Sequence, residues 1–159
     1  MSDLPARVTK ALNSDCAADL EEILYERRAD DFVLVQGFIA SERKAGFEHR
    51  ARAIYLLGRW GDPAAVPTIL NILPQLDDRG RIAAIDALGR FGTQEAVAAV
   101  IENSRHPSPQ IRKIAVHVLG RFDSGEAKER LRETERTDSN ALIRKLASKA
   151  LAGAGSNPR

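Results

Sequence analysis

The sequence predicts an all-α fold, an α-α superhelix or solenoid of about ten helices in roughly four to five helix pairs. Three observations predict it: a short motif recurs at a fixed spacing, apolar residues recur at the spacing of a buried helix face, and the composition favours helices. Hydrophobic residues make up 43% of the chain but aromatic residues only 5%. Alanine and the aliphatic residues therefore form the core, which is typical of closely packed helices.

The recurring motif is Leu-Gly-Arg followed by an aromatic residue. It begins at Leu57, Leu88 and Leu119, so both steps measure 31 residues, 88 − 57 and 119 − 88. Arginine and alanine recur at the same step, in the sets Arg50, Arg81, Arg112 and Ala53, Ala84, Ala115. A fixed step of this length is typical of a helix pair that stacks on copies of itself.

Two further positions in the repeat predict where the helices of each pair end and begin. Glycine is expected to end the first helix in a left-handed conformation, at Gly58, Gly89 and Gly120. Side chains that can accept hydrogen bonds from free amides are expected to cap the second helix, at Asp31, Asp62, Thr93 and Ser124.

These positions order the elements along the chain. A short helix at about 4–12 comes first, with Asp3 as its cap and Pro5 near its first turn. A degenerate repeat, three regular repeats and a closing helix follow, at 15–43, 46–73, 79–104, 108–135 and 139–153. The closing helix is displaced by one residue, which indicates an insertion near Asp138. We expect a single solenoid over residues 1–155 and a mobile tail at 156–159.

The segment 50–67 reads Arg-x-x-Ala-x-x-x-Leu-Gly-Arg-aromatic-Gly-Asp-Pro-x-Ala-Val-Pro. It resembles the HEAT-like repeats of phycobilin lyases, which have an armadillo-like helical fold, and the resemblance covers about 45–155. It implies a fold but leaves the function open, because similar repeats occur in bilin lyase subunits, deoxyhypusine hydroxylase, DNA-glycosylase-like proteins and many scaffold proteins.

We find no set of residues that predicts catalysis or a cofactor. The hydroxylase family holds iron with His-Glu pairs on several repeats, whereas His49, His106 and His117 form no such pairs. Cys16 has no histidine near it in the chain, and no serine lies in a Gly-x-Ser-x-Gly turn. The residues therefore favour a non-enzymatic protein without a metal or other cofactor.

The charge of the chain is nearly balanced. Lys and Arg number 24 against 22 Asp and Glu, which gives a formal net charge of +2 and disfavours a nucleic-acid partner. The single cysteine cannot form an internal disulfide, and the sequence has neither a leader pattern nor a long uncharged apolar run. We expect a cytoplasmic protein without a membrane segment, while the oligomeric state is left open.

The second helices are expected to line a concave groove that binds a protein or peptide. The stretches 31–42, 62–73 and 93–103 contain no Lys or Arg, and the groove becomes acidic toward Glu102, Glu129 and Glu133. A helix or extended peptide with basic character therefore fits best. The residues predicted to face this partner are Gln36, Pro67, Thr68, Asn71, Ala98, Ala99, Glu102, Glu129, Arg130 and Glu133.

An alternative binding edge is formed by Arg59, Arg90 and Arg121. A structural role is favoured for it, because a cation after a helix complements the helix dipole and can pair with nearby acidic groups. A protein-interaction module is the favoured function. The alternatives are a subunit or chaperone resembling the bilin lyases, acting on a chromophore-bearing or modified protein, and, more weakly, nucleic-acid binding through the arginine edge.

Overall fold

The computed structural model describes residues 6–14, 17–41 and 47–153. This described part contains ten α-helices and two short 3-10 helices but no strand, which confirms the predicted all-α fold. The 3-10 helices, η1 (Pro63–Ala65) and η2 (Leu73–Gln75), flank α5. The α-helices are α1 (Ala6–Asn13), α2 (Ala17–Tyr25), α3 (Asp31–Ser41), α4 (Phe47–Trp60), α5 (Val66–Ile72), α6 (Asp78–Phe91), α7 (Gln94–Asn103), α8 (Pro109–Leu119), α9 (Gly125–Thr137) and α10 (Ala141–Gly153).

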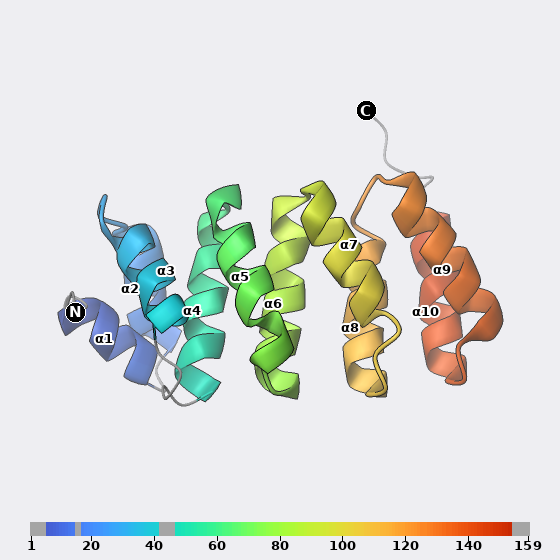
Figure 1. Cartoon of the computed structure of the whole chain (residues 1–159), viewed down its shortest axis with the longest axis horizontal. Coiled ribbons are helices and arrows are strands. Elements are labelled where there is room, and N and C mark those ends of the chain that lie inside the picture. Colours follow the sequence, from blue (N-terminus) through green and yellow to red (C-terminus); the bar gives the residue numbers. More distant parts are fainter. Residues whose placement is uncertain (1–5, 15–16, 42–46, 154–159) are drawn as a thin grey trace.

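The helices form two layers, one in front of the other in Figure 1. The front layer, which we call the second-helix layer, contains α3, α5, α7 and α9, and each of these contacts the next. The rear layer, which we call the first-helix layer, contains α2, α4, α6, α8 and α10 in a similar series. The helix α1 packs against α2 and α4 at the N-terminal end. This arrangement is the solenoid that the 31-residue step predicts.

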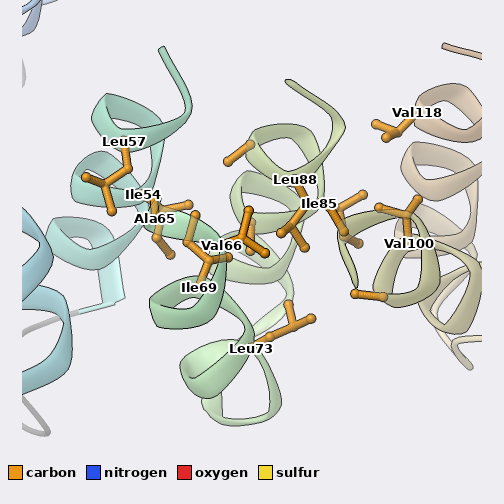
Figure 2. Packing of buried hydrophobic residues seen from close by; sticks show 14 of the residues in the cluster. Ile54, Leu57, Ala65, Val66, Ile69, Leu73, Ile85, Leu88, Val100 and Val118 are labelled. Carbon is orange, nitrogen blue, oxygen red and sulfur yellow. The ribbon is translucent and has the colours of Figure 1, made fainter. Parts of the chain in front are cut away.

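The core lies between the two layers. Ile54 and Leu57 of α4 and Ile85 and Leu88 of α6 are fully buried, as is Ile69 of α5. Figure 2 shows these side chains meeting where α5 lies over α4 and α6. The spacing of three residues places each pair on one face of its helix, and burial of each such side chain contributes about 1.5–3 kcal/mol.

Three of the predicted caps are present. The Asp62 carboxylate accepts a hydrogen bond from the Ala64 amide at 3.0 Å. The hydroxyls of Thr93 and Ser124 accept from amides three residues further on, each at 3.3 Å. These contacts satisfy amides that a helix start leaves without a partner in the helix. The caps predicted at 93 and 124 are therefore confirmed for α7 and α9, and the cap at 62 belongs to η1, which leads directly into α5.

Asp31 differs from the other three. It is the first residue of α3, and its side chain is almost fully buried. Its carboxylate accepts a hydrogen bond from the Arg28 amide, which precedes the helix, and pairs with the guanidinium of Arg7. Asp31 thus joins α1 to the start of α3, so its expected role as a cap of the second helix was wrong.

Only Gly120 ends a first helix as predicted, and none of the three motif glycines has the predicted left-handed conformation. Gly58 and Gly89 lie inside α4 and α6, and Gly120 follows α8 with a right-handed φ of −64°. A Cβ atom at Gly58 would lie 2.8 Å from Cβ of Ala87, and one at Gly89 would lie 2.5 Å from Cγ1 of Val118. Neighbouring first helices approach closely at these positions, so a residue with a Cβ atom does not fit without a shift. Glycine is therefore required for this contact.

The left-handed turn occurs three residues later in the chain. Gly61 and Gly92 have φ values of 71° and 65°, a conformation that glycine adopts without strain. The third repeat has Asp123 at this position, and no residue other than glycine has positive φ in the described part. This difference fits the earlier end of α8, at Leu119, because the left-handed cap is missing.

Some sequence-based predictions lie outside the described residues. These are the cap Asp3, the proline at position 5, the environment of Cys16 and the tail 156–159. The helix predicted at about 4–12 is described as α1, from Ala6 to Asn13. The division into repeats at 15–43, 46–73, 79–104 and 108–135 with a closing helix remains our proposal.

Candidate functional site

The exposed side of the second-helix layer changes in charge along the solenoid. The exposed residues described on α3 and α5 carry no charge, and they include Val33, which is 66% exposed. On α7 the exposed Ala98 lies between Glu95 and Glu102. The exposed residues of α9 have both signs, for example Glu129 and Arg132. An apolar, neutral half is thus followed by a charged half.

The predicted groove residues do not all face outward. Five of them are exposed: Pro67, Asn71, Ala98, Glu102 and Glu129. Gln36, Thr68 and Glu133 are partly exposed. Ala99 and Arg130 are only 9% exposed, so the prediction that they point outward was wrong.

Several polar groove residues hold the second helices together. The Gln36 amide donates to the Ala64 carbonyl oxygen and to the Thr68 hydroxyl, at 2.9 and 2.8 Å, which joins α3 to α5. The Arg130 guanidinium donates to the Ser104 hydroxyl at 2.6 Å and to the Ser104 carbonyl oxygen at 3.0 Å. These groups are therefore occupied within the chain, and Arg130 is buried because it reaches the end of α7.

Glu129 and Glu133 of α9 are likewise paired. Glu133 lies 2.7 Å from Arg130 and 3.3 Å from Arg105. The hydrogen bond from Arg130, followed by its charge, lowers the pKa of the Glu133 carboxyl. Glu129 pairs with Arg132 at 3.1 Å. By contrast, Glu95 and Glu102 on α7 make no hydrogen bond or ion pair within the described ranges.

A hollow of about 840 Å³ opens between α5 and α7. Its apolar lining includes Leu70, Leu73 and Pro74 from α5 and η2, and it includes Ala98 and Ala99 from α7. The polar lining consists of Arg81, Glu95, Glu102, Asn103, Arg105 and His106. The hollow therefore combines an apolar lining with charges of both signs.

Two arginines of this hollow were missed by the sequence analysis as site residues. Arg81 belongs to the first helix α6, and its Nη1 donates to Oδ1 of Asn103 at 3.2 Å. Arg105 follows α7. The sequence-based prediction considered only the outward side of the second helices, and α5 and α7 contain no Lys or Arg. The recurrence of arginine at 50, 81 and 112 was the signal that could have indicated Arg81.

The comparison with protein families agrees with this geometry. The family model for HEAT repeats matches residues 34–108. This match and the all-helical fold support a HEAT-like repeat protein. The match does not distinguish the phycobilin-lyase type from other HEAT repeats. No curated protein matches the chain. HEAT repeats commonly act as scaffolds for protein interactions, and extended surfaces of stacked repeats suit that role.

The arginine edge of this HEAT-like repeat protein makes contacts within the chain. The Asp86 carboxylate lies 3.2 Å from Arg90 and 3.1 Å from Arg121, so one acidic group serves two repeats. The Arg59 guanidinium lies 5.9 Å from the centre of the Tyr55 ring, on the same helix. These contacts agree with a structural role for the edge.

Metal and membrane sites were also considered in the HEAT-like repeat protein. Within residues 6–14, 17–41 and 47–153, no three His, Cys, Asp or Glu side chains are grouped as a metal site would require. The helices described there are all too short or too polar to cross a bilayer.

Proposed function

We propose that this HEAT-like repeat protein is a non-enzymatic scaffold that binds a protein partner on the exposed side of its second-helix layer. The partner supplies a helix or an extended peptide with an apolar part and basic residues. Because packed helices lie about 8–10 Å apart, four second helices span roughly 30–40 Å, enough for a partner helix of about 20 residues. The proposed contact surface is formed by the exposed groove residues Pro67, Asn71, Ala98, Glu102 and Glu129, with Ala99 as part of the hollow.

The unpaired carboxylates of α7 are the observation that supports this proposal. Glu95 and Glu102 lie on either side of Ala98, over the apolar lining of the hollow. Neither makes an ion pair within the described part of the chain, whereas Glu129 and Glu133 do. A bulky apolar side chain in the hollow and a lysine or arginine beside it would complement this surface.

A selection from displayed random peptides tests the proposal without a known partner. The purified protein is the target, and the affinity of each selected peptide is then measured for the parent and for two variants. Ala98→Arg places a large cation at the mouth of the hollow, and it is expected to weaken binding by about tenfold or more. His117→Arg, at an exposed position of α8, is the matched control and is expected to leave affinity unchanged.

The sequences of the selected peptides provide a second measurement. They are expected to combine a large apolar residue with lysine or arginine. Melting temperatures of both variants should equal that of the parent, because both positions are exposed. If the selected peptides bind Ala98→Arg as well as the parent but lose affinity for His117→Arg, the working surface is the first-helix layer and the proposal is wrong.

The alternative functions have no specific observation in their favour. The arginine edge is partly neutralised by Asp86. No contact in the described part of the chain points to a chromophore. We therefore carry only the protein-binding function forward.

A further inference from the structure

Two loops of the solenoid have the same hydrogen-bond pattern. In the loop before α10, the Arg144 guanidinium donates to the carbonyl oxygens of Asp138 and Ser139. In the loop before α8, the Arg112 guanidinium donates to the carbonyl oxygens of His106 and Pro107. The first acceptor lies six residues before the arginine in both cases. His106 therefore occupies the position in its loop that Asp138 occupies in the next.

A second pair of contacts supports this equivalence. Oδ1 of Asp138 accepts a hydrogen bond from the Asn140 amide, two residues further on, at 2.8 Å. Nδ1 of His106 accepts from the Ser108 amide, also two residues further on, at 3.1 Å. The two side chains thus have the same local role. The remaining nitrogen of His106, Nε2, is the one left to carry a proton.

The next repeat shows one group that an arginine in this position can bind. Arg112 makes a two-pronged ion pair with Asp138, with Nε at 2.9 Å from Oδ2 and Nη2 at 3.2 Å from Oδ1. Such paired contacts are the geometry in which guanidinium recognises a carboxylate most strongly. Arg81 precedes Arg112 by one repeat step, 112 − 81 or 31 residues. Its counterpart of Asp138 is His106, an imidazole rather than a carboxylate.

Arg81 therefore has no acidic partner within the described residues. It makes one hydrogen bond, to the Asn103 side chain, and no ion pair. Glu95 and Glu102 line the same hollow, but neither lies within ion-pair distance of Arg81. The hollow is thus bordered by a partly buried guanidinium and the His106 imidazole, with apolar Leu73 and Pro74 beside them. A carboxylate is the group that complements this border.

We propose that the hollow binds an aspartate or glutamate side chain of the protein partner, through Arg81 with His106 beside it. This proposal rests on the proposed function and deepens it. The partner then carries an acidic residue for Arg81 as well as basic residues for Glu95 and Glu102. Charges of opposite sign within one hollow fix the direction in which the partner lies. The partner's carboxylate supplies to Arg81 the negative charge that Asp138 supplies to Arg112 in the next repeat.

A small carboxylate tests the site without any peptide. Phenylacetate has an apolar ring and a carboxylate, and phenylacetamide is its neutral counterpart. Titrations are followed by amide chemical shifts of the whole chain. Phenylacetate is expected to bind weakly and to shift Ala98, Ala99 and Asn103, whereas phenylacetamide is expected to bind roughly tenfold more weakly or not at all. Equal binding of the two probes would show that no carboxylate site exists.

Two variants locate the probe. Arg81→Gln is expected to reduce phenylacetate affinity by roughly tenfold. His106→Asp places a carboxylate of the chain itself opposite Arg81, so it is expected to abolish phenylacetate binding and to raise the melting temperature. That rise is a readout that a damaged fold would not give. The matched control, His117→Asp on the exposed side of α8, is expected to change neither.

Some results with the same variants would contradict the proposal. If Arg81→Gln binds phenylacetate like the parent, or if His106→Asp retains the probe, the carboxylate does not meet Arg81. If His106→Asp lowers the melting temperature while His117→Asp does not, the two loops are not equivalent and the argument fails.

The selected peptides connect the site to a partner. They are expected to contain an internal acidic residue, whose replacement by the corresponding amide weakens binding to the parent but not to Arg81→Gln. Amidation of the peptide C-terminus is expected to have no effect, which separates a side-chain carboxylate from a chain end. If peptides bind the surface without an acidic residue, this inference fails and the proposed function stands. If phenylacetate binds at Arg81 but no peptide depends on Ala98, the proposed function fails and the carboxylate site stands.

Discussion

The first-helix and second-helix layers are built from the same repeat but are joined differently. In the first-helix layer, glycine lies against the neighbouring helix, as with Gly58 against Ala87. In the second-helix layer, polar side chains such as Gln36 and Arg130 bridge the helices, and a hollow opens between α5 and α7. In the first-helix layer, a larger side chain at these glycines would therefore push neighbouring helices apart. The second layer tolerates different side chains, so a binding surface can differ between repeats while the fold is kept.

The largest expected effect on stability comes from a substitution in a loop that joins the two layers. Asp138 and Arg112 form an ion pair whose side chains are 5% and 12% exposed. Asp138→Asn removes one partner of this buried pair and is expected to cost about 3 kcal/mol of unfolding free energy, measured by urea unfolding. Asp123→Asn is the matched control, because the Asp123 side chain is 95% exposed and pairs with Lys128 at the surface. Equal losses in the two variants would contradict the structural role of the Arg112 position.

The same ion pair predicts a dependence of stability on pH. Burial raises the pKa of the Asp138 carboxyl, but hydrogen bonds from Arg112 and the Asn140 amide, with the charges of Arg112 and Arg130, outweigh it, so the pKa is lowered. A lowered folded-state pKa means that the contribution is fully present above the unfolded value of about 3.9 and is lost as pH falls below it. The stability difference between the parent and Asp138→Asn should therefore shrink in acid. A difference that is constant down to the acid range would show that the carboxylate charge is not involved.

One substitution made in both layers tests the comparison directly. Gly58→Ala would bring Cβ to 2.9 Å from the backbone Cα of Ala87, so the two helices must separate. We expect a loss of about 2 kcal/mol in urea unfolding. Gly37→Ala in α3 meets no atom within 4 Å. We expect it to gain about 0.5–1 kcal/mol, because alanine is the better helix former. If both variants changed the unfolding free energy in the same direction, the expected difference between the layers would be contradicted.

The smallest effect on stability is expected within the hollow. Glu102 is exposed and makes no ion pair in the described part of the chain. Glu102→Gln should leave the melting temperature unchanged. It should increase phenylacetate affinity, because a repelling carboxylate is removed, and should weaken the binding of basic peptides. Peptide and probe affinities that move in the same direction would show that Glu102 does not contact the ligand.

The sequence predicted the architecture well, because repetition reports each structural constraint several times. Helix-capping residues at 62, 93 and 124 were recognisable since their chemistry is local. The role of Gly58 was not recognisable from the sequence, because a helix stop and a close helix contact both require glycine. The structure separates the two: Gly61 makes the turn and Gly58 makes the contact.

The candidate site was predicted only in part, because side-chain direction depends on packing between repeats. Ala98 and Glu102 were placed on the exposed surface by helical periodicity alone. Arg130 was misplaced because its guanidinium reaches the end of the neighbouring α7, a contact that no periodicity encodes. Arg81 was missed as a site residue because it enters the hollow from the other layer. The role of His106 also depends on a hydrogen-bond pattern that only the structure shows.

The prolines around α5 affect the thermodynamics of binding. Pro63 begins η1, Pro67 lies in the first turn of α5, and Pro74 lies in η2. Each proline ring fixes one backbone angle, so this segment has few conformations to lose. Binding of a ligand against this proline-rich segment should therefore carry a small entropic cost for the protein. A ligand of the hollow would be recognised by a preformed surface, and differences in affinity between ligands should appear mainly in their dissociation rates.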